Sequence, residues 1–388
     1  MKKVFTLFFI LSAFLQSFSQ IVLDSTNMPT VGWTQQTVKD TLPLPSISYG
    51  NKGANQVYDF GALSPYSNST VEYRALTSGQ ASTFPNANIA ITSDGTNFLF
   101  TRNQSAKLTG EGLAGNISGI NTSVNFSPVN DVYHFPTQYN GNFSSTWAFD
   151  KTVNNVTVNF NGAPVTLSAV HVTFNATDFD TIDGWGKTIT PVGAYKSLRE
   201  KRKEFNHTFI EYKLFSFSSW TTLSNTYDTT VRYSYLTKET KGSVVTFDYD
   251  SLNNLLDMTY SLIPPAAPIA LFGDTSGGGG LIFFSDSTDG YPTTYSWTFG
   301  DGGTSSSTNP NHTYSANGAY NVCLTVTNAG GNTTYCDSVH VNGITGVNHT
   351  PVAVNDTVTL LQATSTIIHV AANDVDPDGD NLCVDTVW

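Results

Sequence analysis

The sequence predicts an all-β, multi-domain protein with a large sandwich-like domain at its N-terminal end, and its composition carries this prediction. Aromatic residues make up 13% of the chain and charged residues only 12%, which is about half the usual charged fraction. Threonine, serine, asparagine, valine and glycine dominate the remainder, and the alanine-, leucine-, glutamate- and lysine-rich windows that helices prefer are missing. With 388 residues, the chain is long enough for two or three domains.

The first 19 residues have the pattern of a secretory signal peptide. Lys2 and Lys3 precede an apolar run from Val4 to Leu15, and Ser17-Phe18-Ser19 supplies the small residues of a signal-peptidase site. The apolar run is too short to span a bilayer, and no later stretch is long enough. We therefore expect cleavage before Gln20 and an exported protein without a transmembrane segment.

Residues 20–263 carry repeated short stretches in which apolar and polar residues alternate. Val156, Val158 and Phe160 share one face of such a stretch, and Asn161-Gly162 follows as a strong hairpin signal. Similar alternation recurs in residues 229–236 and 243–249. The pattern predicts one all-β domain, either a sandwich or a twisted multi-sheet structure.

Residues 264–268 are rich in proline and mark a domain boundary, because consecutive prolines cannot continue a strand ladder and favour an extended linker. A second β domain follows at 268–343. A further repeat begins near residue 351, but residues 351–388 are too few for a sandwich of about 100 residues. We therefore expect the chain to end inside a domain.

Charge is distributed unevenly along the chain. Residues 20–241 contain 16 lysines and arginines against 16 aspartates and glutamates, whereas residues 242–388 contain 14 aspartates and no lysine or arginine. Adding Lys2 and Lys3 gives the net charge of −12. The acidic part argues against nucleic acid or anionic lipid as a partner, and it suits either divalent cations or a solvated surface.

The segment 295–307 reads YSWTFGDGGTSSS, and its glycines raise the question of a ligand-binding loop. Tyr295, Trp297 and Phe299 alternate with polar residues, so they share one face of a strand, and residues 300–303 suit a tight reversal. A phosphate-binding loop would need a helix after its glycines and usually a lysine nearby. This segment lies between strands and has no lysine, so we predict a turn.

These residues resemble the PKD domain, an immunoglobulin-like β-sandwich of bacterial surface proteins and of secreted polysaccharide- or protein-degrading enzymes. The resemblance covers residues 268–341, and its motif residues include Trp297, Phe299, Gly300, Asp301, Gly302, Tyr314 and Tyr320. It implies a structural or binding module without catalytic residues of its own. Trp297 would be a core residue, and Asp301 would hold the turn through side-chain hydrogen bonds. The alternative is an exposed Trp297 that stacks on sugars.

The chain has three cysteines. Cys323 and Cys336 lie symmetrically about Ala329-Gly330, so a hairpin centred there would place the two thiols opposite each other on neighbouring strands. A disulfide is then reasonable in an oxidising compartment, and two buried thiols are the alternative. For Cys383 we expect a partner beyond the end of this chain.

Residues 351–384 resemble the start of the cadherin-like or immunoglobulin-like repeats that occur in tandem on large bacterial adhesins. Four carboxylates, those of Asp374, Asp376, Asp378 and Asp380, offer oxygen ligands of the kind that calcium prefers. Their spacing is not that of an EF-hand, and in such repeats a neighbouring module supplies part of the ligand set. A calcium site and a solvated acidic turn both stay open.

No catalytic motif occurs in residues 20–263. They lack H-E-x-x-H, G-x-S-x-G and any cysteine nucleophile, although a glycosidase needs only two carboxylates. Asp178, Asp180 and Asp183 beside Trp185 could form a small sugar or metal site. An aspartate–glycine turn is the interpretation that we favour.

The chain has one cluster of basic residues. Glu200 and Glu204 interrupt this cluster, which favours cross-strand charge pairing over an anionic-polysaccharide patch. Residues 183–204 also resemble, faintly, a segment of N-terminal domains of proteins exported by the type IX route, and this resemblance implies no activity. The cluster consists of Lys196, Arg199, Lys201, Arg202 and Lys203.

We therefore expect a non-catalytic protein, secreted or held on the outer surface of a Gram-negative cell, that acts in adhesion, spacing or presentation. Its partner would be an extracellular glycan or protein rather than a nucleic acid, and calcium is the one cofactor that the sequence suggests. The alternative is a carbohydrate-binding accessory part of a polysaccharide- or protein-degrading enzyme whose catalytic domain lies beyond residue 388.

Overall fold

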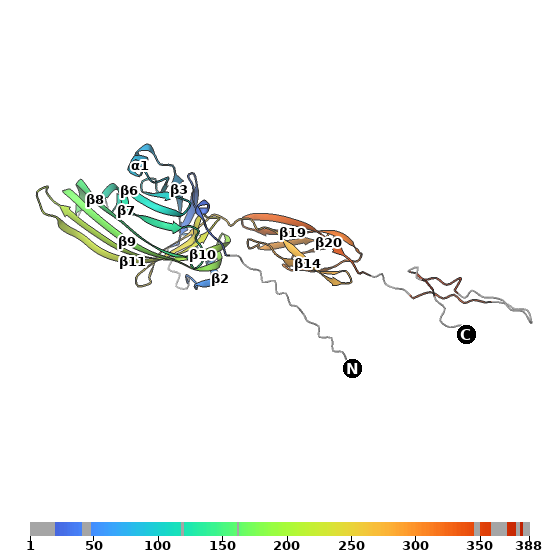
Figure 1. Cartoon of the computed structure of the whole chain (residues 1–388). Helices are drawn as coiled ribbons and strands as arrows, with labels where there is room; N and C mark the ends of the chain where they lie inside the picture. Colours follow the sequence, from blue (N-terminus) through green and yellow to red (C-terminus); the bar gives the residue numbers. More distant parts are fainter. Residues whose placement is uncertain are drawn as a thin grey trace, which may run out of the picture. The chain divides into compact units, whose positions relative to one another are not determined.

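The computed structural model describes residues 20–40, 48–117, 120–160, 163–344, 350–357, 371–377 and 381–382. It forms two compact units, the first containing the chain up to Ile269 and the second most of the chain from Ala270. Both units consist almost entirely of strands, which confirms the predicted all-β class (Figure 1). The predicted signal peptide lies outside the described residues. Within the described residues, no helix combines the length and the apolar character that crossing a membrane requires.

Thirteen strands of the first unit join in one sheet, in the order β2-β9-β10-β11-β12-β13-β1-β3-β4-β5-β6-β7, with β8 paired to β9. Strand β2 runs parallel to β9, and the other neighbouring strands are antiparallel. A short 3₁₀ helix, η1 (Ser25–Asn27), and one short helix, α1 (Ser78–Thr83), accompany them. The strands are β1 (Thr34–Lys39), β2 (Gly53–Asp59), β3 (Ser67–Arg74), β4 (Ile89–Thr92), β5 (Phe98–Asn103), β6 (Lys107–Ile117), β7 (Ile120–His134), β8 (Asn142–Phe160), β9 (Ala163–Thr190), β10 (Gly193–Lys213), β11 (Thr221–Thr237), β12 (Gly242–Asp250) and β13 (Leu255–Ser261).

The sheet folds back on itself, so a single sheet provides both layers of a sandwich. Val124 and Phe126 of β7 pack with Phe149 of β8 and with Val170 and Val172 of β9 in one hydrophobic cluster. The predicted hairpin between β8 and β9 forms, with Phe160 opposite Ala163, and its two turn residues lie outside the described residues. Burial of alternate apolar residues holds the two layers together, because a strand presents every second side chain to the same face.

A second cluster of the first unit is rich in aromatic side chains. Tyr58 and Phe60, from β2 and just after it, meet Tyr195 of β10, Tyr235 of β11 and Phe247 of β12. The Tyr195 hydroxyl donates a 2.6 Å hydrogen bond to the carbonyl of residue 263, and the Tyr235 hydroxyl donates to the carbonyl of residue 49. These partners let the hydroxyl groups of Tyr195 and Tyr235 be buried without loss of hydrogen bonding.

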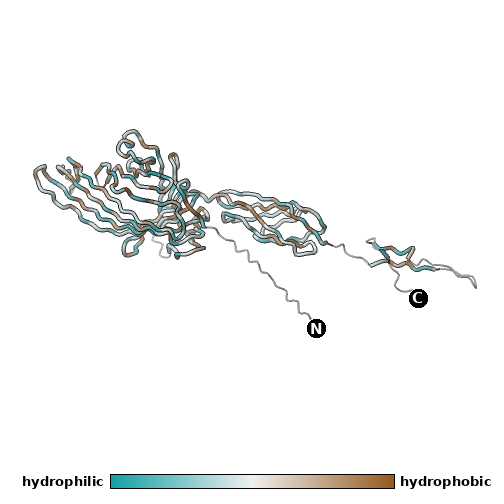
Figure 2. The backbone as a smooth tube through the Cα atoms, in the orientation of Figure 1, coloured by the Kyte–Doolittle hydropathy of each residue, from teal (hydrophilic) through white to brown (hydrophobic). Residues whose placement is uncertain are grey.

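The second unit is a sandwich of two small sheets. One sheet has the order β14-β15-β18 and the other β17-β16-β19-β20. Apolar side chains from both sheets form the core, which centres on the fully buried Trp297. Apolar and polar residues are intermixed along the strands rather than grouped in long blocks (Figure 2). The strands are β14 (Phe272–Gly278), β15 (Leu281–Asp286), β16 (Thr294–Thr298), β17 (Thr304–Ser305), β18 (Asn311–Thr313), β19 (Gly318–Asn328) and β20 (Gly331–Val341).

Candidate functional site

The aromatic residues of the glycine-rich segment are core residues of the second unit. Trp297 on β16 has an exposed fraction of 0%, and its Nε1 donates a 2.8 Å hydrogen bond to the carbonyl of Ser307. Phe299 directly after β16 is equally buried, and Phe272 and Phe284 contact the indole ring. An indole with no exposed surface cannot stack on a sugar, so the sugar-stacking alternative for Trp297 is wrong.

The turn after β16 is held by side-chain hydrogen bonds. Gly300 has a φ of +83°, and a Cβ there would lie 2.8 Å from the carbonyl oxygen of Asn321, so the position requires glycine. Asp301 accepts a 2.9 Å hydrogen bond from the Gly303 amide and lies 2.7 Å from Nε2 of His312. Partial burial raises the pKa of Asp301, but the hydrogen bonds from His312 and Gly303 lower it by more, so the pKa lies below its ordinary value.

Two tyrosines complete this arrangement. The Tyr314 hydroxyl donates a 3.0 Å hydrogen bond to the carbonyl of Phe299, and the ring of Tyr320 packs 4.1 Å from the ring of Tyr314. The residues of the motif therefore hold the turn and the core, and their polar groups are hydrogen-bonded to other residues of the same domain.

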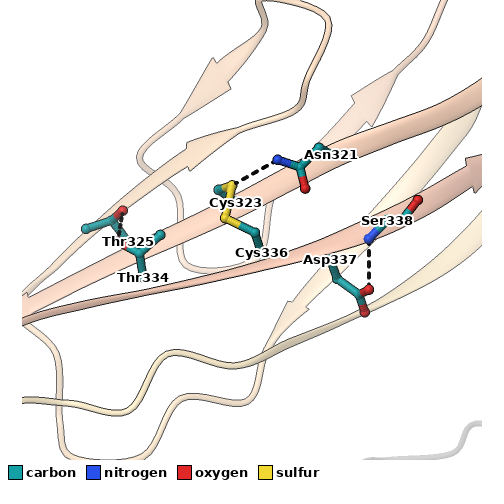
Figure 3. The surroundings of a disulfide bond; sticks show 7 residues. All are labelled: Asn321, Cys323, Thr325, Thr334, Cys336, Asp337 and Ser338. Carbon is teal, nitrogen blue, oxygen red and sulfur yellow. Dashed lines mark hydrogen bonds between the residues drawn. A yellow bond between two sulfur atoms is a disulfide. The ribbon is translucent and has the colours of Figure 1, made fainter.

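Cys323 of β19 and Cys336 of β20 form a disulfide (Figure 3). Their Cα atoms lie 4.1 Å apart, and the two residues between the strands are Ala329 and Gly330, at the centre that the symmetry argument requires. The Asn321 side chain lies beside the bond, with its nitrogen 3.7 Å from the sulfur of Cys323 (Figure 3). The bond joins neighbouring strands and has a structural role.

The acidic segment of the first unit lies in the middle of strand β9, so its interpretation as an aspartate–glycine turn is wrong. Gly184 and Gly186 are present because β2 runs directly alongside. A Cβ on Gly186 would collide with the backbone of Gln56, and a Cβ on Gly184 would collide with the hydroxyl of Tyr58. Glycine here permits close approach of a strand, which a sequence cannot distinguish from a turn.

The carboxylates of this segment meet the basic cluster across the β9–β10 ladder, as the predicted cross-strand pairing requires. Asp180 lies opposite Arg202, and its oxygen is 2.6 Å from Nε of the guanidinium group. Arg202 also donates a 2.7 Å hydrogen bond to the carbonyl of Val132. Asp183 accepts a 3.0 Å hydrogen bond from Arg199, which is 3% exposed and lies beneath the ring of Tyr233. The pairs are buried, and such charges are stable only while they remain paired.

Asp178 and Glu204 form a pair of two carboxyl groups on the same ladder. They lie opposite each other on β9 and β10, and the Nε1 atom of Trp147 donates a 3.2 Å hydrogen bond to Asp178. Burial, with the nearby charge of Glu204 as the next cause, raises the pKa of Asp178 to about 7. Glu200 has a pKa of about 7 as well, chiefly because of burial. Asp178 has an exposed fraction of 0%, so no polymer can contact its carboxyl group in this structure.

The basic cluster does not form one patch. Arg202 is directed to the inner face of the sheet, and Arg199 is covered by Tyr49 and Tyr233. Lys201 and Lys203 lie on the opposite face to Arg202, and Lys203 is exposed. Alternation along β10 therefore separates Arg202 from Lys201 and Lys203, whereas Arg199 is buried by the rings above it and Lys196 pairs with Asp289.

One polar cluster gave no signal in the sequence. His171 of β9 lies with Nε2 2.8 Å from Asp150 of β8 and with Nδ1 3.0 Å from Glu211 of β10. Burial acts in the opposite direction, but hydrogen bonds to Glu211 and Asp150 raise the pKa of His171. Its three members are separated by 21 and 40 residues, so only the strand register brings them together. No group of three or more metal-ligating side chains occurs in the part of the chain that the structure describes.

The acidic stretch at the C-terminal end is only partly described. Asp374 accepts a 2.7 Å hydrogen bond from the amide of Val354, beside a bridge between Val352 and Val375. Asp378, Asp380 and Cys383 lie outside the described residues. Calcium binding by Asp374 to Asp380 stays a prediction.

Comparison with known proteins supports the immunoglobulin-like class that the second unit defines. Residues 266–343 match the family model described as PKD domain. Residues 266–343 of this chain are therefore a PKD domain, as the motif at Trp297 predicted.

Two solved structures are similar to a part of the chain. The PKD1 domain of Vibrio anguillarum Epp is 30% identical, and the PKD1 domain from the Vibrio cholerae metalloprotease PrtV is 29% identical. Each match covers 20% of this chain and 98% of the other, with a TM-score of 0.19. No curated protein matches the chain.

Proposed function

We propose that this chain is a non-catalytic protein, secreted or held on the outer surface of a Gram-negative cell, that acts in adhesion, spacing or presentation. The PKD domain is a non-catalytic module of surface and secreted proteins. The observation that carries the proposal is that the polar groups of the motif residues are bonded inside the domain. Trp297, Asp301 and Tyr314 all direct their polar groups to partners inside the domain.

The ionisable residues of the first unit support the same proposal. Asp178 and Asp180 are the strongest candidates for acid–base chemistry there, and both are almost completely buried. A general acid has to reach the proton that it transfers, directly or through one water molecule. Groups buried in this way are better suited to holding two strands together than to acting on a polymer.

The leader-like pattern of residues 1–19 and the faint type IX resemblance of residues 183–204 support export. A carbohydrate-binding accessory role is the second candidate, and the exposed rings of Phe179, Phe205 and Tyr227 on the first unit favour it.

The test has two arms. Intact cells that express the full chain are treated with an added protease, and the purified chain on beads is tested for retention on polysaccharide- and protein-coated surfaces. We expect the protease to remove the chain from the cells, or the chain to be found in the medium, and we expect the beads to be retained. A chain that the protease cannot reach and that stays inside the cells, or new reducing ends in the polysaccharide after incubation, would overturn the proposal.

A further inference from the structure

The middle of strands β9, β10 and β11 has one buried face and one exposed face. On β9, Ala176, Asp178, Asp180 and Ile182 are buried, whereas Phe179 and Thr181 between them are exposed. Successive side chains of a strand point to opposite faces. The register places Phe179 opposite Lys203 and His207 opposite Tyr227, so the exposed face continues across the three strands. We call this surface the ring face. It consists of Phe179, Thr181, Lys201, Lys203, Phe205, His207, Tyr227 and Thr229.

Three aromatic rings are exposed on the ring face. Phe179 is 50% exposed, Phe205 is 42% exposed and Tyr227 is 75% exposed. The rings of Phe179 and Phe205 meet edge to face at 6.0 Å, and Tyr227 stacks on His207 at 4.1 Å. One exposed ring needs no explanation, but three on adjacent strands of one face indicate an interaction site.

The side chains around these rings are short and polar. On either side of Phe179 lie Thr177 and Thr181, and Asn225 and Thr229 flank Tyr227. Hydroxyl and amide groups beside exposed rings can hydrogen-bond the hydroxyl groups of a sugar while the rings contact its apolar face.

The charge of the ring face is positive. In the described residues, neither Lys201 nor Lys203 forms an ion pair within 4.0 Å, and Lys203 Nζ lies 4.6 Å above the ring of Phe205. Asp183 is a carboxylate whose pKa burial raises and the charges of Arg199 and Lys201 partly lower, and it accepts its hydrogen bond from Arg199. Asp178, Asp180 and Glu204 lie on the opposite, buried face. Two unpaired ammonium groups beside exposed rings complement a ligand that carries carboxylate groups.

We propose that the ring face binds an acidic polysaccharide, with the rings contacting apolar sugar faces and Lys201 and Lys203 pairing with uronate carboxylates. From Lys201 to His207 the strand spans about 20 Å, at about 3.4 Å per residue, which is room for several sugar units of an extended chain. The proposal rests on the non-catalytic adhesive function proposed above and names the partner of that function. A protein partner is an outcome that the test detects.

The experiment measures retardation of the full chain in native gels that contain polygalacturonate or, as the neutral reference, dextran. The ring variants are Phe179→Ser, Phe205→Ser and Tyr227→Ser, and the charge variant is Lys201→Gln with Lys203→Gln. Tyr66→Ser is the matched ring control, because Tyr66 is 71% exposed and lies before β3. Lys238→Gln, at an exposed position after β11, is the matched charge control.

We expect retardation by polygalacturonate and little by dextran. Each ring variant should lose about tenfold in affinity, and the charge variant should lose affinity at low salt by a factor that shrinks as salt is added, while both controls bind like the wild type. Equal retardation by dextran, or ring and charge variants that bind like the controls, would overturn the proposal. Beads retained on protein-coated surfaces by a chain that no polysaccharide retards would leave the adhesive function standing and reject the acidic polysaccharide.

Discussion

Replacing Arg202 by methionine should destabilise the first unit strongly. The guanidinium group lies 2.6 Å from an oxygen of Asp180 and 2.7 Å from the carbonyl of Val132, and the Asp180 side chain has an exposed fraction of 0%. Arg202→Met leaves the aspartate charged, buried and without its partner, and it also removes the nearest positive charge from Glu200, 4.0 Å away. Loss of one member of a buried ion pair costs about 3–5 kcal/mol.

The measurement is urea unfolding at pH 8, followed by tryptophan fluorescence, because Trp147 is hydrogen-bonded within the same polar network. The matched control is Arg74→Met, which removes an equally short ion pair to Glu72 whose side chains are 47% and 39% exposed. The control should cost about 1 kcal/mol or less. Arg202→Met with Asp180→Leu should recover much of the loss, because the orphaned carboxylate is removed. If Arg202→Met costs no more than Arg74→Met, the assignment of Arg202 as a buried partner is refuted.

Three further predictions concern pH, the core of the PKD domain and its disulfide. The pKa of Asp178 is raised to about 7 from an unfolded value near 3.9, so the stability that this group contributes is fully present below about pH 4 and is lost as the pH rises through 7. The melting temperature should fall over that range, and Asp178→Asn should make the fall smaller. A variant with the same pH profile as the wild type would contradict this prediction. Trp297→Ala should destabilise the PKD domain by about 3–5 kcal/mol in calorimetry, because the indole has no exposed surface, and a change below about 1 kcal/mol would show that the site is not core. Replacing Cys323 and Cys336 together by serine should cost about 2–4 kcal/mol through the 13-residue loop that the bond closes, and added reductant should lower the melting temperature of the wild type but not that of the variant.

The local features of the PKD domain could be predicted because each lies within one strand or one turn. Alternation of Tyr295, Trp297 and Phe299 fixes which face is apolar, and the glycines after them allow only a reversal. The position of Ala329-Gly330 midway between the cysteines likewise needs only the count of residues between them. Such patterns act over a few neighbouring residues, and the sequence displays those directly.

In the first unit, contacts between distant strands could not be predicted from local patterns. The sequence predicts a turn at Gly184 and Gly186, because no neighbouring residue indicates that β2 pairs with this segment. Strand β2 lies more than 120 residues earlier in the chain. The basic residues from 196 to 203 look like one cluster, and only the pairing of β10 with β9 divides them into buried ion pairs and surface lysines. His171 meets Asp150 and Glu211 for the same reason.

By itself, the sequence determined the all-β class, the PKD domain and the turn that its motif forms, because alternation and glycine placement act through local backbone geometry. The tertiary structure alone decided which carboxylates are buried, which lysines are free and which rings share a face. Those properties depend on the register between strands that are distant in the chain, and register is set by the burial of whole faces rather than by any single segment.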